Sequence, residues 1–194
     1  MLLHDLLAGK KVVLASKSPR RQSLIQGLDI PYEIRTKEVD ETWPPHLKRH
    51  EVAVFLAELK AEAFEPAEDE IVITSDTIVA LGDRIIEKPK DVADAMRMLR
   101  DLSGQVHTVY TAVAFRSREK LHSFYDATEV HFRELTDEEI EYYANKYQPL
   151  DKAGAYGVQE WIGYVAVERM VGSYFTVMGF PVHKVYSELV EFLG

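Results

Sequence analysis

Long strand-forming stretches that end in tight polar turns constrain the fold of this chain more than any other feature. The stretch I-V-I-T-S-D-T-I-V-A-L, residues 71–81, is strand-like on both sides of an interruption at Ser75 and Asp76, and the Gly-Asp pair that follows predicts a hairpin turn. Two more long strands are predicted over residues 106–116 and 121–132, joined by the polar turn S-R-E-K. The sheet therefore contains two antiparallel hairpins.

Helical patterns alternate with these strands. Asp91 can cap a helix that ends before Gly104, and Thr136 with Glu139 forms a capping box that opens another. Helices are predicted over residues 19–27, 46–64, 91–102, 136–147 and 182–193, and shorter strands over residues 12–14, 31–36 and 164–170. This order predicts an α/β protein with a mixed sheet.

Length and charge narrow the class of protein. With 194 residues the chain fits one domain, residues 1–194, which can be built as two lobes. Its 23 basic and 32 acidic residues leave a formal net charge of -9, which disfavours broad nucleic-acid binding. A positive pocket for a small phosphate ligand remains compatible with that charge.

The chain has no cysteine, which excludes disulfides, thiol nucleophiles and cysteine-ligated zinc. Its start, M-L-L-H-D-L-L-A-G-K-K, has lysines after a short apolar stretch, the reverse of a secretory signal. No apolar run approaches membrane-spanning length. We therefore expect a cytoplasmic protein without a membrane partner.

Two serines and two arginines stand between the first strand and the first helix. Ser16, Ser18, Arg20 and Arg21 fall within six positions, with Ser18 as the predicted N-cap and Pro19 at the first helical position. Free backbone N–H groups, hydroxyls and guanidinium groups together suit a phosphate. An ordinary capped helix with solvated arginines explains the same residues, and this stretch alone leaves both interpretations open.

Asp76 is the most informative single residue, because an aspartate between β-formers needs compensation for its charge. A metal ion, a lysine or an attacking water can supply it, whereas an aspartate that binds turn amides at a bulge is the structural alternative. Lys88 follows the hairpin closely enough to point into the same cleft, although an exposed loop lysine is the usual case. Lys60 lies on an amphipathic helix, where lysines are normally solvated.

The loop D-K-A-G-A-Y-G-V-Q, residues 151–159, combines two glycines with an acid, a base, a tyrosine and an amide. Such loops let the backbone approach a ligand, but a plain structural turn has the same composition. The sequence contains no G-x-x-x-x-G-K-[ST], G-x-G-x-x-G, G-x-S-x-G or H-E-x-x-H motif. The commonest nucleotide-hydrolase and protease motifs are thus absent.

Several motifs occur together in one order: L-A-S-K-S-P-R-R, S-D-T-I-V, E-K-P-K-D, P-L-D-K-A-G-A-Y-G-V-Q and G-S-Y-F-T-V-M-G-F-P. In this the chain resembles the Maf family of nucleoside triphosphate pyrophosphatases, also described as septum-formation inhibitors. The E-K-P and K-A-G-A-Y-G-x-Q versions resemble its dTTP/UTP branch. The resemblance implies a two-lobed, mixed-sheet Maf/ITPase-like fold with a central cleft, and commonly a homodimer. It also implies cleavage between the α and β phosphates, assisted by Mg²⁺ or Mn²⁺.

The resemblance also implies functions for particular residues. Asp76 matches the proposed catalytic base, and it can alternatively hold the metal. Glu33 matches a carboxylate implicated with the metal. The positions that match substrate choice are Arg20, Thr77 and Gln159, and the polar or basic cleft positions are Ser16, Arg21, Lys60 and Lys88.

The sequence departs from the family pattern at two positions. Glu160 stands where glycine is common after the glutamine of the last loop, and Thr176 stands where asparagine is common. We expect the first to alter loop shape and the second a local hydrogen bond. Two alternatives to dTTP/UTP hydrolysis remain: a pyrophosphatase for modified or non-canonical nucleotides, and a nucleotide-binding regulator of cell division.

Overall fold

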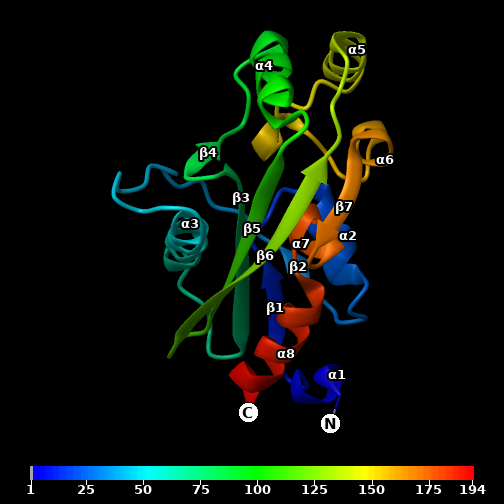
Figure 1. Cartoon of the computed structure of the whole chain (residues 1–194). Coiled ribbons are helices and arrows are strands. Elements are labelled where there is room, and N and C mark those ends of the chain that lie inside the picture. Colours follow the sequence, from blue (N-terminus) through cyan, green and yellow to red (C-terminus); the bar gives the residue numbers. More distant parts are fainter. Residues whose placement is uncertain (1) are drawn as a thin grey trace.

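A seven-stranded mixed sheet forms the centre of the molecule in the computed structural model, which describes residues 2–194 (Figure 1). The strands are β1 (Lys11–Leu14), β2 (Glu33–Ile34), β3 (Glu70–Leu81), β4 (Arg84–Ile86), β5 (Val106–Arg116), β6 (Leu121–Phe132) and β7 (Val167–Val171). Their order is β2-β1-β3-β5-β6-β7, and β4 pairs with β3. β1 is parallel to β2 and β3, and the other pairs are antiparallel. The predicted α/β architecture with a mixed sheet is confirmed.

Helices flank this sheet. They are α1 (Leu3–Leu6), α2 (Pro19–Gln26), α3 (His50–Glu62), α4 (Val92–Leu102), α5 (Asp137–Tyr147), the 3₁₀ turn η1 (Ala153–Ala155), α6 (Trp161–Ala166), α7 (Tyr174–Met178) and α8 (Val182–Leu193). The two caps read from the sequence are confirmed: Asp91 accepts from the Asp94 amide at 2.8 Å, and Thr136 with Glu139 forms the capping box of α5. No helix within residues 2–194 has both the length and the apolar character to cross a membrane.

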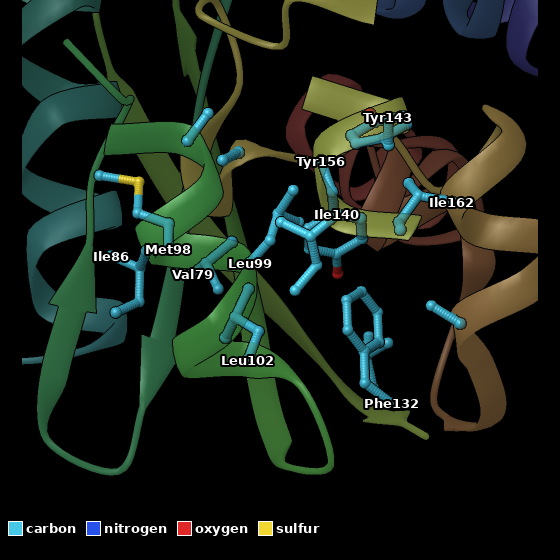
Figure 2. Packing of buried hydrophobic residues seen from close by; sticks show 14 of the residues in the cluster. Val79, Ile86, Met98, Leu99, Leu102, Phe132, Ile140, Tyr143, Tyr156 and Ile162 are labelled. Atoms are coloured by element: carbon cyan, nitrogen blue, oxygen red, sulfur yellow. The ribbon is translucent and has the colours of Figure 1, made fainter. Parts of the chain in front are cut away.

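Separate hydrophobic clusters pack against the two ends of β3. Val79 belongs to a cluster with Leu99 and Leu102 of α4 and residues of α5, which Figure 2 shows. Ile71 and Ile73 belong to another cluster, built with α2 and α8. Fully burying one leucine side chain contributes about 1.5–3 kcal/mol, so both clusters anchor the strand firmly. The middle of β3 is thereby held between them.

β3 is one continuous strand, which corrects the predicted interruption at Ser75 and Asp76. Both residues keep regular antiparallel register with β5, where Ser75 pairs with Val113 and Asp76 with Ala112. The strand continues because each polar side chain has a partner outside the ladder: Ser75 Oγ donates to the Gly179 carbonyl, and Asp76 accepts from a lysine. Asp76 therefore does not cap turn amides at a bulge.

Other boundaries also differ from the prediction. Of the expected strand 164–170, the first part lies in α6 and β7 begins at Val167, because a short apolar run fits either period. The second strand covers two residues, and α3 begins at His50 after Arg49, which has a φ of 49°. The helices α1 and α7 were not predicted, since both are very short.

Candidate active site

A cleft of about 740 Å³ opens beside the middle of β3. Five segments contribute most of its wall: the β1–α2 loop, the β2–α3 loop, the centre of β3, the loop before α6, and the end of α7. The residues predicted for the site that line it are Ser16, Arg20, Arg21, Lys60, Asp76, Thr77, Lys88 and Gln159. The structure therefore brings eight of the nine predicted residues to one cavity, although they span much of the chain.

Asp76 forms a buried ion pair with Lys60. The Asp76 residue is 8% exposed, and its Oδ1 lies 2.6 Å from Lys60 Nζ, which α3 presents across the cleft. The ammonium compensates for the desolvation of the carboxylate. Within the described residues Asp76 Oδ2 makes no hydrogen bond, so that oxygen is available to a water or a ligand.

Glu41 is a second carboxylate in this cluster and was missed by sequence reasoning. Its Oε1 lies 3.2 Å from Lys60 Nζ, and the residue lines the cleft from the loop between β2 and α3. No local pattern in the stretch D-E-T-W shows that it folds back onto a helix. Lys60 thus bridges two carboxylates on different segments.

Glu33 is the one predicted site residue that does not line the cleft. It lies on the edge strand β2, its side chain is 65% exposed, and its Oε2 is 3.8 Å from the Arg35 guanidinium. Arg35 also forms a short ion pair with Glu70, and this pairing lowers the pKa of Glu70 to about 2. The structure therefore places Glu33 in a surface ion-pair cluster and does not bring it to the cleft with Asp76, and its metal role stays a prediction of the resemblance.

The β1–α2 loop presents a helix N-terminus to the cleft. Ser18 occupies the N-cap position with Pro19 after it, as predicted, but its side chain makes no capping hydrogen bond. The Ser18 amide instead donates to Ser16 Oγ at 3.2 Å, which folds the loop back on itself. The first-turn amides, including those of Arg20 and Arg21, thus have no side-chain cap, as an anion-binding helix terminus requires.

Arg21 connects three elements around the cleft. Its Nε donates to the Gly179 carbonyl at 2.9 Å and its Nη2 to Thr77 Oγ1 at 3.1 Å. Thr77 in turn shares a 2.9 Å hydrogen bond with Thr111. Gly179 has a φ of 100°, which suits glycine and aims its carbonyl at the guanidinium. Burial lowers the pKa of Arg21 from its usual value.

Arg20, unlike Arg21, is not held by hydrogen bonds within the described residues. It lines the cleft, and the described part of the chain supplies no hydrogen bond or ion pair to its guanidinium. Lys88 lines the cleft in the same way, from the segment after β4. Because neither group is held by a carboxylate, both cations can turn to an anionic ligand.

The loop before α6 closes the other side of the cleft. Gly154 has a φ of 74°, and a Cβ there would lie 3.0 Å from Val79, so glycine allows the loop to pack on β3. Gln159 lines the cleft, and its buried Oε1 has no hydrogen-bond partner within the described residues. Buried acceptors without a partner are rare in folded proteins, so this amide stands out as one that the protein itself does not hold by hydrogen bonds.

The two departures from the family pattern now have structural explanations. Glu160 lies against this loop, where it forms an ion pair with Lys152. Lys152, 9% exposed, also lines the cleft, although the sequence showed it only as one base within the loop. The Thr176 hydroxyl donates to Asp126 at 2.5 Å, and the backbone carbonyl of Thr176 accepts from Thr111. Thr176 thereby fixes α7, which carries Gly179.

The chain is similar to known proteins in sequence and in fold. A family model described as "Maf-like protein" matches residues 11–192. A protein of Flavobacterium johnsoniae named dTTP/UTP pyrophosphatase is 48% identical over 190 residues, covering 97% of this chain and 98% of the relative. One of Christiangramia forsetii with the same name is 46% identical over 195 residues, covering both chains completely. A solved HAM1 protein from Coxiella burnetii has a TM-score of 0.51 at 14% identity, covers 94% of this chain and 99% of its own, and is similar in fold alone.

Proposed function

The chain belongs to the Maf family, and on that premise we propose that it hydrolyses dTTP and UTP to the nucleoside monophosphate and pyrophosphate. The observation that carries the proposal is the cleft that Asp76 shares with the uncapped N-terminus of α2 and with the cations Arg20 and Lys88. Hydrolysis of a phosphoanhydride needs a positioned water and neutralisation of the leaving group, and this set of groups supports both.

The cations of the cleft fit a triphosphate. The amides at the start of α2 and the guanidinium of Arg20 suit the phosphate oxygens, because both donate hydrogen bonds, the amides with the partial positive charge of a helix N-terminus and the guanidinium with a full one. Lys88 adds a second cation to the cleft, from the segment after β4. Arg21 contributes by position, since it holds the loop, β3 and α7 together.

Asp76 is the proposed base for the attacking water. Lys60 holds its Oδ1 at 2.6 Å, which fixes the direction of Oδ2. That free oxygen can accept the proton of a water in line with the α-phosphorus. The proton of the water goes to Asp76, and the water oxygen forms a bond to the α-phosphorus. The bond between the α-phosphorus and the bridging oxygen breaks, and pyrophosphate leaves with the electron pair of that bond.

A divalent cation fits the oxygen donors on this wall. Asp76 and Glu41 both contact Lys60 Nζ, at 2.6 and 3.2 Å, so the two carboxylates lie on the same part of the cleft wall. Residues 2–194 contain no group of three or more His, Cys, Asp or Glu side chains arranged for a metal. Mg²⁺ typically uses one or two carboxylates with substrate phosphates, which suits this pair. When bound, Mg²⁺ or Mn²⁺ would neutralise charge on the phosphates.

The bond that is cleaved provides a direct test. In ¹⁸O-labelled water we expect UTP to give UMP and pyrophosphate with the label in UMP, because the proposed water attacks the α-phosphorus. Mass spectrometry of both products measures this. Orthophosphate and UDP as the first products, or label in pyrophosphate, would contradict the mechanism.

The nucleobase preference is a second test. Uracil and thymine present an acceptor, a donor and an acceptor along one edge, so the Gln159 amide can pair with a donor and an acceptor together. Cytosine has a donor where uracil has its exocyclic acceptor, which leaves polar groups unpaired. We expect dTTP and UTP to be hydrolysed much faster than CTP or ATP. Gln159→Ala should reduce this difference in rate, chiefly by slowing the hydrolysis of dTTP and UTP.

The control for this experiment is Gln26→Ala, which removes an exposed amide from the end of α2 outside the cleft. It should leave the ranking of the four nucleotides unchanged. Preference of the wild type for a purine triphosphate would rule out the proposed base specificity. Unchanged ratios in Gln159→Ala would remove Gln159 from base recognition.

We also propose the homodimer that the resemblance implies. Exposed apolar side chains near α6, β7 and α7 support a contact there, among them Tyr164, Val171, Tyr174 and Phe175. The cytoplasmic location stays a prediction of the sequence.

A further inference from the structure

Glu160 is a carboxylate in the cleft wall that the proposed reaction does not use. It occupies the N-cap position of α6, directly after Gln159. Its Oε2 accepts the hydroxyl hydrogen of Tyr143 on α5, and its Oε1 lies 3.2 Å from Lys152 Nζ. Since each oxygen already has a protein donor, Glu160 is poorly placed to bind a nucleobase itself.

The Tyr143 hydroxyl joins both ends of the turn that contains Gln159. It accepts a hydrogen bond from the Gly157 amide at 3.0 Å and donates its own hydrogen to Glu160. The turn is closed by the Glu160 amide, which donates to the Gly157 carbonyl at 2.9 Å. Burial raises the pKa of Tyr143, so the hydroxyl keeps the proton that this arrangement needs.

The side chains of Gln159 and Glu160 both lie over Gly157. A Cβ on Gly157 would be 2.8 Å from Glu160 Cδ and 3.1 Å from Gln159 Nε2. Within the described residues the Gln159 amide has no hydrogen-bond partner of its own, and its Oε1 is buried. The direction of the amide therefore depends on packing against the turn, and the turn depends on Glu160.

We propose that Glu160 is a positioning residue for nucleobase recognition: it ties residues 157–160 to α5 and to Lys152, and thereby fixes the Gln159 amide in the cleft. The inference rests on the proposed function, because it concerns selectivity for uracil and thymine. A loosened turn allows the amide several orientations, which weakens base pairing. The chemical step is spared, since Asp76 lies on β3 outside the turn.

Steady-state kinetics with UTP and CTP test this proposal in three variants. Glu160→Gln can still accept from Tyr143 but loses the ion pair, so its KM for UTP should rise about 3- to 5-fold. Glu160→Ala loses both contacts, and its KM should rise about 10-fold or more, with kcat within about 2-fold of wild type in both. The UTP-to-CTP ratio of kcat/KM should fall in the same order. Tyr143→Phe should also lower the UTP-to-CTP ratio of kcat/KM.

Glu139→Gln is the matched control, because Glu139 lies on α5, the helix that carries Tyr143. It ion-pairs with Arg133 at 2.7 Å and forms the capping box, but does not line the cleft. This variant should lower Tm and leave the UTP-to-CTP ratio unchanged. If Glu160→Ala fails to fold, Glu160→Gln and Tyr143→Phe, which nearly keep the side-chain volumes, decide the question.

The outcomes separate this inference from the proposed function. The wild type can prefer UTP over CTP while Glu160→Gln and Tyr143→Phe keep the same preference. That result overturns the inference alone and leaves Glu160 a stabilising residue. A fall in kcat at unchanged KM overturns it as well, because the effect then lies in the chemical step. A wild type without a uracil preference overturns the proposed base specificity, and the inference with it.

Discussion

Replacement of Asp76 by asparagine is expected to lower kcat by about two to four orders of magnitude, the range for a lost acid–base group. Asparagine keeps the volume of the side chain, but its amide cannot take the proton of the attacking water. Lys60 keeps Glu41 as an ion-pair partner at 3.2 Å, so the fold should be retained. The measurement is turnover of UTP with Mg²⁺ or Mn²⁺, together with Tm and circular dichroism.

The control is Asp83→Asn in the turn after β3, where Asp83 pairs with Arg49 at the surface. Its turnover should equal that of the wild type, since exposed ion pairs contribute little. Near-normal turnover in a well-folded Asp76→Asn protein would leave Asp76 as a structural partner of Lys60 and would remove it from the mechanism.

The adjacent arginines are expected to respond differently to the same substitution. Arg20→Met should lower kcat/KM for UTP by about 10²- to 10³-fold with little change in Tm, because no partner within residues 2–194 holds this guanidinium. Arg21→Met should lower Tm by about 5–10 °C as well as activity, because it removes the donor to the Thr77 hydroxyl and one of the two donors to the Gly179 carbonyl, Ser75 being the other.

Arg100→Met on α4 serves as the control for both variants, since Arg100 pairs with Asp137 on the surface away from the cleft. It should change neither kcat/KM nor Tm appreciably. Equal losses of Tm in Arg20→Met and Arg21→Met would show that both arginines hold the fold. Unchanged kcat/KM in Arg20→Met would exclude it from phosphate binding.

Local patterns in the sequence determined most of the helices and strands. The capping box at Thr136, the cap at Asp91 and the two hairpins were read correctly because each depends on neighbours a few residues apart. The basic and polar residues of the cleft were named mainly from the family resemblance, because side-chain type and spacing alone left Lys60 and Lys88 as ordinary solvated lysines. Short elements such as α7 escaped detection because few residues carry their signal.

Only the tertiary structure decided which of these side chains meet. Asp76 stays in an unbroken strand because Lys60, from α3, neutralises it, and no periodicity within β3 reveals that partner. Glu41 reaches the cluster while Glu33 does not, although both are glutamates near β2. Such contacts depend on strand order and helix packing between distant segments, and a buried charge is tolerated only where that packing supplies its partner.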